Sequence, residues 1–245
     1  MKLPIRTILF GVLATAAVLL CVRLGFWQLD RLEQRRARNA AVQAKAQLPA
    51  ADVGQLRGGD SASIHWRHVQ MRGIPDYDRE IVLAARSQAG APGVQLLTPV
   101  RPVDGSFGDT AILVLRGFVY APDGIEFDKV AAREGDTLDI DGLVTFFPPK
   151  RPGNVRLTSS ATAIRYLDRD TIEAMIGRPI EPYLLLALGD TVPESMTKPA
   201  RVPPPSLSEG PHFSYAMQWF GFATVFAVGF VAFVVNSRKE QGAHT

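Results

Sequence analysis

Three residues near the C-terminal end of the chain could hold a flat, apolar ligand: His212, Tyr215 and Trp219. An α-helix turns about 100° per residue, so these side chains would lie within about 60° of one another on one helix face. A neutral imidazole is a standard ligand of haem iron, and aromatic rings beside it can cover a porphyrin. Tyrosine and tryptophan also gather at membrane interfaces, where a neighbouring histidine is simply hydrated. These residues alone leave both interpretations open.

Two residues near the N-terminal end would complete such a site if the two ends of the chain packed together. Trp27 could form a second aromatic wall. The guanidinium of Arg23 could pair with carboxylates such as the propionates of a haem. In this interpretation His212 is the axial ligand of the haem iron, and Tyr215, Trp219, Trp27 and Arg23 surround the ring.

The rest of the chain offers little other chemistry. His65 and His68 form an H-x-x-H, but positions i and i+3 of a strand face opposite sides and would not converge on one metal. Cys21 is the only cysteine, which excludes a disulfide within the chain and argues against a thiolate copper carrier or a thiol oxidoreductase. The G-x-S-x-G, P-loop and Rossmann patterns are absent, so the sequence does not predict an enzyme.

Two apolar segments determine the class of protein. They cover residues 7–22 and 213–235, and a helix needs about 20 apolar residues to cross roughly 30 Å of hydrocarbon. Arg6 and Arg23 bracket the first segment, where long arginine side chains can reach the headgroups. A cleaved signal peptide is the alternative for this segment, but no small-x-small cleavage site follows it. We therefore expect two transmembrane helices.

The middle of the chain has β character. Six segments of alternating or β-branched apolar residues, bounded by Gly, Pro or Asp, predict strands. One short helix is expected over residues 168–179, with Asp170 as its cap and Gly177 and Pro179 at its end. The close spacing of the strands favours a sandwich or a small barrel over a parallel sheet. The predicted strands cover residues 66–73, 80–86, 93–100, 110–120, 137–147 and 183–188.

The expected fold class is therefore a membrane protein in which two transmembrane helices flank a mostly-β (α+β) extramembrane domain. Small and polar residues dominate positions 47–59, which is typical of a linker, and prolines dominate the stretch before the second span. The expected segments are an N-terminal transmembrane helix (1–27), a juxtamembrane helix and linker (28–59), a mostly-β extramembrane domain (60–190), a Pro-rich spacer (191–210), a C-terminal transmembrane helix (211–236) and a C-terminal tail (237–245).

Charge bears on partners and on orientation. The net charge of +3 is too small to indicate nucleic acid binding. The distribution of Lys and Arg around the spans favours a cytoplasmic middle domain, but long segments are translocated largely regardless of charge. The basic start followed by apolar residues resembles an export signal with its N-terminus inside. On balance this places both termini in the cytoplasm and the middle domain outside.

Several motifs resemble a known family. The chain contains LGFWQLDRLEQR (24–35) after the first span, RHVQMRGIPDYDREIVLAAR (67–86) and ILVLRGFVYAP (112–122) in the middle, and PHFSYAMQWFGFA (211–223) at the second span. In this order, and over almost the whole chain, they are similar to the surfeit locus protein one family. The opening and closing motifs are the more specific ones.

The resemblance implies an assembly factor for haem-copper respiratory oxidases. Bacterial relatives are held to bind haem a through a histidine near the second span, here His212, and to assist its delivery to the catalytic subunit. The tryptophans of the family correspond to Trp27 and Trp219, and its arginine–glycine pair to Arg116 and Gly117. The chain departs from the family at Phe118, where a tryptophan is usual, so a function of the indole N–H there would be lost.

These observations lead to a non-enzymatic haem carrier as the first hypothesis. Its expected partners are the catalytic subunit of a haem-copper oxidase, haem a synthase and the lipid bilayer, and the resemblance implies the cell inner membrane with the β domain in the periplasm. A cofactor-free scaffold that stabilises an oxidase subunit through its β domain is the alternative. A membrane-bound hydrolase is disfavoured because the chain offers no evident nucleophile–base pair.

Overall fold

The computed structural model describes residues 5–192, 195–204 and 206–243. Parts of the expected N-terminal helix (1–4), spacer (193–194 and 205) and C-terminal tail (244–245) lie outside the described residues. The chain divides into two compact units. A helical unit combines residues 1–41 with 207–245, and a β unit covers residues 42–206. Each unit is described by itself below.

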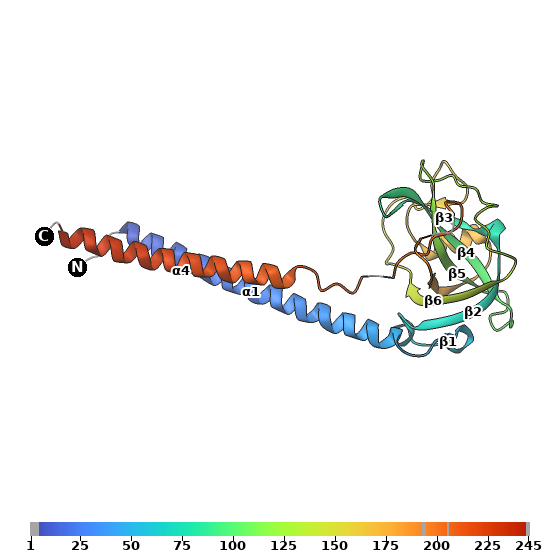
Figure 1. Cartoon of the computed structure of the whole chain (residues 1–245), viewed down its shortest axis with the longest axis horizontal. Coiled ribbons are helices and arrows are strands. Elements are labelled where there is room, and N and C mark those ends of the chain that lie inside the picture. Colours follow the sequence, from blue (N-terminus) through green and yellow to red (C-terminus); the bar gives the residue numbers. More distant parts are fainter. Residues whose placement is uncertain (1–4, 193–194, 205, 244–245) are drawn as a thin grey trace. The chain divides into compact units, whose positions relative to one another are not determined.

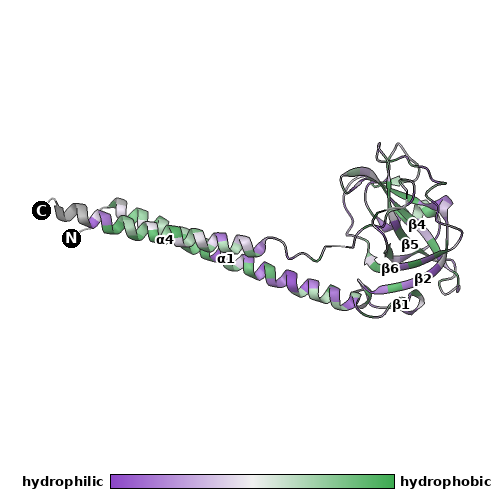
Figure 2. Cartoon of the chain, in the orientation of Figure 1, coloured by the Kyte–Doolittle hydropathy of each residue, from purple (hydrophilic) through white to green (hydrophobic). Residues whose placement is uncertain are grey.

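The helical unit is a pair of long helices, α1 (Ile5–Ala46) and α4 (His212–Ala243). They run in opposite directions, because Phe10 packs against Phe230 and Phe233 at one end while Phe26 packs against Phe220 at the other. Both are long and apolar enough to cross a membrane, and hydrophobic residues dominate most of α4 and the N-terminal half of α1 (Figure 2). This confirms the two expected apolar helices. α1 continues without a break into the expected juxtamembrane segment and ends at Ala46.

Small side chains bring the two helices close together. The buried residues of α1 and of α4 recur at heptad spacing, the period of a helix seam that faces one partner. A Cβ placed on Gly25 would lie 2.6 Å from a ring carbon of Phe220, so glycine is required for this approach. Small residues serve the same purpose at other membrane helix interfaces. The buried seam residues are Thr7, Cys21, Gly25 and Leu32 of α1, and Ala216 and Ala223 of α4.

The β unit is built on one eight-stranded sheet (Figure 1). Its order is β1-β2-β6-β8-β5-β4-β3-β7, and a further pairing of β2 with β4 closes the five strands β2, β6, β8, β5 and β4 into a barrel. Among these barrel strands only β5 and β8 pair in parallel. The strands are β1 (Ala51–Asp52), β2 (His68–Pro75), β3 (Ile81–Gln88), β4 (Ala91–Pro102), β5 (Ala111–Tyr120), β6 (Leu138–Phe146), β7 (Ala163–Ile164) and β8 (Ile180–Ala187).

All six predicted strands are thus present, and the small barrel is the form that the domain takes. The alternation of apolar and polar residues explains why β2 could be predicted. Every second residue of β2 is buried, which lets one face of the strand pack into the core. β5 is instead buried along nine of its ten residues, since both of its faces are covered. Short helices complete the unit: η1 (Val53–Leu56), α2 (Ser61–Ile64), η2 (Tyr77–Arg79) and α3 (Arg169–Ile176).

α3 confirms the predicted helix but corrects its cap. The side chain of Asp168, not Asp170, accepts the hydrogen bond from the backbone N–H of Thr171, at 2.9 Å. The helix ends at Gly177, whose φ of 71° is left-handed. α3 then buries Ile172 and Ile176 in an apolar cluster that also contains residues of β5 and β8.

Two segments expected to be mere connections are in fact part of the β unit. Within residues 47–59, Ala51, Val53 and Leu56 are buried in the core, so the linker prediction is wrong there. Within the expected spacer, Ala200 forms an antiparallel bridge with Phe118 of β5. Single apolar residues among small polar ones have no visible periodicity, which is why the sequence does not reveal their burial.

Candidate functional site

His212 is the first residue of α4 and lies against α1. Its Nδ1 is 2.8 Å from Oε1 of Gln28, and the contact is partly buried. Gly210, with a left-handed φ of 72°, precedes it, and the backbone N–H of Tyr215 donates to the carbonyl of Pro211 to start the helix. The imidazole is therefore held at the level where the helix pair begins.

The contact with Gln28 determines what the imidazole can do. An amide oxygen only accepts hydrogen bonds, so a hydrogen bond at this contact requires the proton on Nδ1, and in a neutral imidazole the lone pair is then on Nε2. A Cβ on Gly210 would lie 3.8 Å from Nε2, so the backbone of Gly210 adjoins this edge of the ring. A neutral histidine whose second nitrogen is hydrogen-bonded is the usual arrangement of a metal-binding imidazole.

Tyr215 and Trp219 follow His212 within the first turns of α4. Tyr215 is 45% exposed, and the partly buried ring of Trp219 packs edge-on against Phe222 with centroids 5.9 Å apart. Ala216, between them in sequence, is fully buried against α1. The two rings thus lie beside the seam, and neither is fully buried in it.

Arg23 and Trp27 lie on α1 beside an apolar groove. The groove has a volume of about 670 Å³. Trp27 is 48% exposed, and the guanidinium of Arg31 lies 5.5 Å from its ring centroid, a cation–π distance. The residues that line the groove are Leu19, Val22, Arg23, Leu24, Phe26, Trp27 and Asp30.

Trp27 lies next to Gln28, which contacts His212, and Arg23 lies about one helical turn farther along α1. On α4, Tyr215 and Trp219 lie between His212 and Phe220, and Phe220 contacts Phe26 of α1. Among the described residues, no hydrogen bond or ring contact joins Trp27 or Arg23 directly to Tyr215 or Trp219. The groups themselves, an imidazole, aromatic rings and a guanidinium, fit a haem in their chemistry.

A cluster of polar contacts fastens the start of α4 to α1. Nε and Nη2 of Arg36 donate to the two carboxylate oxygens of Glu209, at 2.7 and 2.9 Å. Arg35 donates to the carbonyl of Ser208 at 3.2 Å. The hydrogen bond from Arg36 lowers the pKa of Glu209, which therefore stays ionised. Because a helix N-terminus carries partial positive charge, this carboxylate just before α4 also stabilises the helix.

In the β unit, the R-G-F-V motif encloses a buried charge. Arg116 is 1% exposed, and its guanidinium donates to Glu80, Thr98 and Glu134 and to the carbonyl of Ala132. Burial by itself lowers the pKa of Arg116, but the carboxylates of Glu80 and Glu134 raise it above its ordinary value. The sequence shows Arg116 but not these partners, which come from separate elements.

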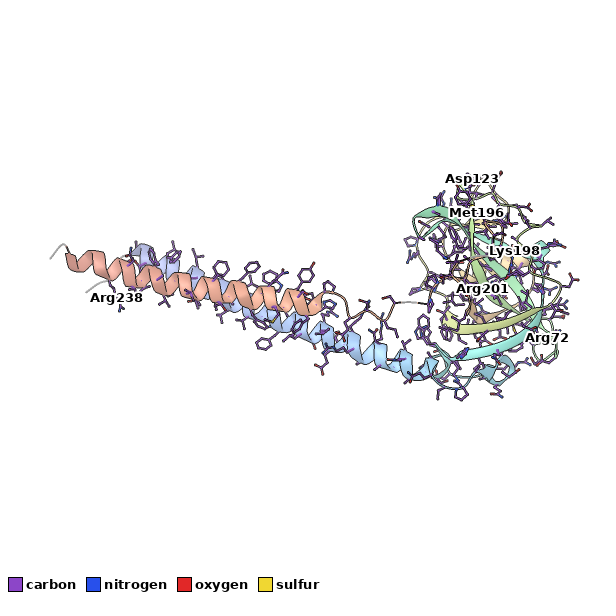
Figure 3. All side chains as sticks on the ribbon, viewed as in Figure 1. Arg72, Asp123, Met196, Lys198, Arg201 and Arg238 are labelled. Carbon is purple, nitrogen blue, oxygen red and sulfur yellow. The ribbon has the colours of Figure 1, made fainter. Side chains whose placement is uncertain are left out.

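A segment we call the strap, residues 198–202, contacts this network through Lys198 and Arg201, which are labelled in Figure 3. Arg201 pairs with Glu134 at 2.7 Å and donates to the carbonyl of Arg116 at 2.6 Å. A Cβ on Gly117 would lie 2.4 Å from the carbonyl oxygen of Ala200, which explains the glycine of the motif. The Phe118 ring covers Gly93, where an added Cβ would lie 2.5 Å from it.

His65 and His68 have separate partners. The His65 ring stacks on Trp66 with centroids 4.7 Å apart and meets Phe146 edge-on. Nε2 of His68 contacts Asp141. Trp66 itself has a left-handed φ of 64°, uncommon for a non-glycine residue. Within the described residues, no three His, Cys, Asp or Glu side chains gather as a metal site.

Comparison with known proteins agrees with the motifs. Residues 15–224 match the SURF1 family. A SURF1-like protein of Rickettsia felis is 25% identical over 232 residues, covering 92% of this chain and 96% of that protein. A SURF1-like protein of Rickettsia conorii is 25% identical over 221 residues, covering 86% of this chain and 85% of that protein. The resemblance inferred from the sequence is confirmed, and the chain belongs to the SURF1 family.

Proposed function

We propose that this protein carries haem a during the assembly of a haem-copper terminal oxidase and assists its insertion into the catalytic subunit. The SURF1 family is known generally as a family of oxidase assembly factors, and the family match covers both apolar helices in part and the whole β unit. The observation that carries the proposal is the contact between His212 and Gln28, which leaves Nε2 of a partly buried imidazole available as a ligand.

The other predicted residues would hold the ligand around that nitrogen. Haem supplies an iron with axial positions open to an imidazole and a flat apolar ring with two carboxylates. Tyr215, Trp219 and Trp27 are sufficiently exposed to pack on such a ring. Arg23 could pair with its carboxylates beside the groove of α1. A single protein ligand suits a carrier, because its cargo must leave again.

The proposed location is the cell inner membrane, with both helices spanning it, both termini in the cytoplasm and the β domain in the periplasm. Two helices long enough to span the bilayer support the membrane part of this proposal. The proposed partners are the catalytic subunit and, as a source of haem, haem a synthase. The protein would act by binding and transfer and would catalyse no reaction itself.

Absorption spectra of the full chain, purified in detergent from cells that make haem a, test the proposal. The wild type should show a haem spectrum, and His212→Ala should lose it while keeping its helix content by circular dichroism. His65→Ala is a matched control, because that imidazole packs on Trp66 in the β unit. Retention of haem by His212→Ala would disprove the ligand assignment. A colourless wild type that still binds an oxidase subunit would favour the cofactor-free scaffold.

A further inference from the structure

We propose that Gln28 is a positioning residue for His212: it fixes the tautomer and the orientation of the imidazole so that Nε2 faces the iron. This inference rests on the proposed function, because it names the residue that prepares the ligand. Gln28 lies one position after Trp27 in α1, and His212 opens α4, so the two come from opposite ends of the chain.

The position of Gln28 in the seam makes its hydrogen bond with His212 energetically important. Gln28 continues the heptad register of Cys21, Gly25 and Leu32, the buried residues on either side of it. A polar amide between apolar helix faces is costly unless it is hydrogen-bonded. Its Oε1 is 2.8 Å from Nδ1 of His212, so the imidazole is a partner for the amide oxygen and the amide holds the imidazole.

The chemistry of the contact favours the form that can bind metal through Nε2. A free histidine side chain prefers the tautomer that carries its proton on Nε2. In that tautomer Nε2 has no lone pair and cannot bind a metal. An accepting oxygen at Nδ1 reverses this preference, since the proton must lie on Nδ1 to donate. The same hydrogen bond makes the imidazole a stronger donor to a metal. An apolar residue at position 28 would remove both effects.

The backbone before His212 is fixed as well, so Gln28 does not act on a loose ring. The ion pair of Arg36 with Glu209 and the hydrogen bond from Arg35 to the carbonyl of Ser208 secure the chain just before α4. Rotation about the side-chain bonds of His212 remains, and the bond to Gln28 is the contact that limits it. Gln28 thus completes the immobilisation of the ring.

Nitrogen-15 spectra of the imidazoles in the haem-free full chain, in detergent micelles, test this directly. The chain has four histidines, and His212→Ala identifies the signal of interest. The wild type should carry its proton on Nδ1 of His212. Gln28→Leu should move the proton to Nε2, whereas Gln28→Glu keeps an accepting oxygen and should retain the wild-type pattern. Gln34→Leu is the matched control, because Gln34 lies on the same helix but bonds to Asp30.

Titration with haem b as the probe gives the second measurement. Gln28→Leu should weaken binding about 10–100-fold, the usual effect of losing a residue that orients a metal ligand, while Gln28→Glu and Gln34→Leu should bind within a few-fold of wild type. Unchanged tautomer and affinity in Gln28→Leu would overturn the inference. If no variant, including wild type, bound haem while Gln28→Leu still changed the tautomer, the carrier function would fail and the role of Gln28 in fixing the ring would stand.

Discussion

Nη2 of Arg116 lies 2.6 Å from Oε2 of Glu80, and both side chains are buried in the β unit. The guanidinium is also 2.6 Å from Glu134 and lies over the ring of Tyr77, at 5.0 Å from its centroid. A buried charge is tolerated only when it is paired and hydrogen-bonded, and here each of the three guanidinium nitrogens has a partner. Arg116 therefore links β5 to the loop that carries Glu134 and to the strap.

Removing one partner of this pair should destabilise the β unit strongly. In Arg116→Met the carboxylate of Glu80 loses its counter-charge and Glu134 keeps only Arg201, and breaking a buried pair in this way costs about 3–5 kcal/mol. The free energy of unfolding can be measured by urea denaturation of the detergent-solubilised chain. Arg72→Met is the control: its 3.7 Å pair with Asp139 is exposed, and such pairs contribute about 0–1 kcal/mol. Equal losses of unfolding free energy in the two variants would contradict this stabilising role of Arg116.

Gly117→Ala should release the strap without removing any charge. The added methyl group would overlap the carbonyl of Ala200 and force the bridge between Phe118 and Ala200 to open. Arg201 is only 24% exposed in its side chain, so we expect slow tryptic cleavage after it in wild type and at least tenfold faster cleavage in the variant. Gly221→Ala serves as control, since nothing lies within 4 Å of a Cβ at that position. Equal cleavage rates would show that the strap tolerates the methyl group.

The seam between α1 and α4 predicts a specific cross-link. Cys21 is the only cysteine, and it is buried in the seam, as is Ala223 of α4. The ring contact between Phe26 and Phe220 sets a register in which these two positions face each other. An oxidant should therefore close a disulfide in Ala223→Cys, detected as loss of thiol labelling that a reductant restores. Val225→Cys, which is 67% exposed, should keep its thiols free. Equal cross-linking of both variants would contradict the seam.

His65 should make the β unit less stable in mild acid. Burial, and secondarily the charge of Lys45, lowers the pKa of His65 below its ordinary value of 6.5. The unfolded chain then binds a proton at a pH where the folded chain does not, so stability falls as the pH drops below about 6.5 towards the lowered pKa and levels off beneath it. His65→Gln should flatten this part of the dependence of Tm on pH. The same slope in the variant would assign the effect to another group.

The secondary structure follows from local pattern. The two long helices are visible as apolar segments because lipid requires about 20 apolar residues in a row, and β2 and β5 are visible because alternation and unbroken β-branched runs are properties of a strand itself. Residues 51–56 and 198–202 escape detection. Their place in the β unit depends on a few contacts with β2, β5 and Glu134, and their residues show no periodicity that would predict these contacts.

The residues of the candidate site also fall into two groups, those that the sequence can predict and those that it cannot. His212, Tyr215 and Trp219 can be grouped from sequence, since a helix places them on one face whatever its surroundings. Gln28 cannot, because its meeting with His212 depends on the register of two helices from opposite ends of the chain. Glu80, Thr98 and Glu134 likewise join Arg116 from separate elements.

The sequence by itself determined the family, the two apolar helices, the strands and the face of α4 that carries the imidazole, because each depends on residue order within one short window. Only the tertiary structure decided the closure of the barrel through β2 and β4, the burial of Arg116 and the pairing of His212 with Gln28. Such contacts depend on how complementary surfaces distant in sequence pack together, and no single segment contains that information.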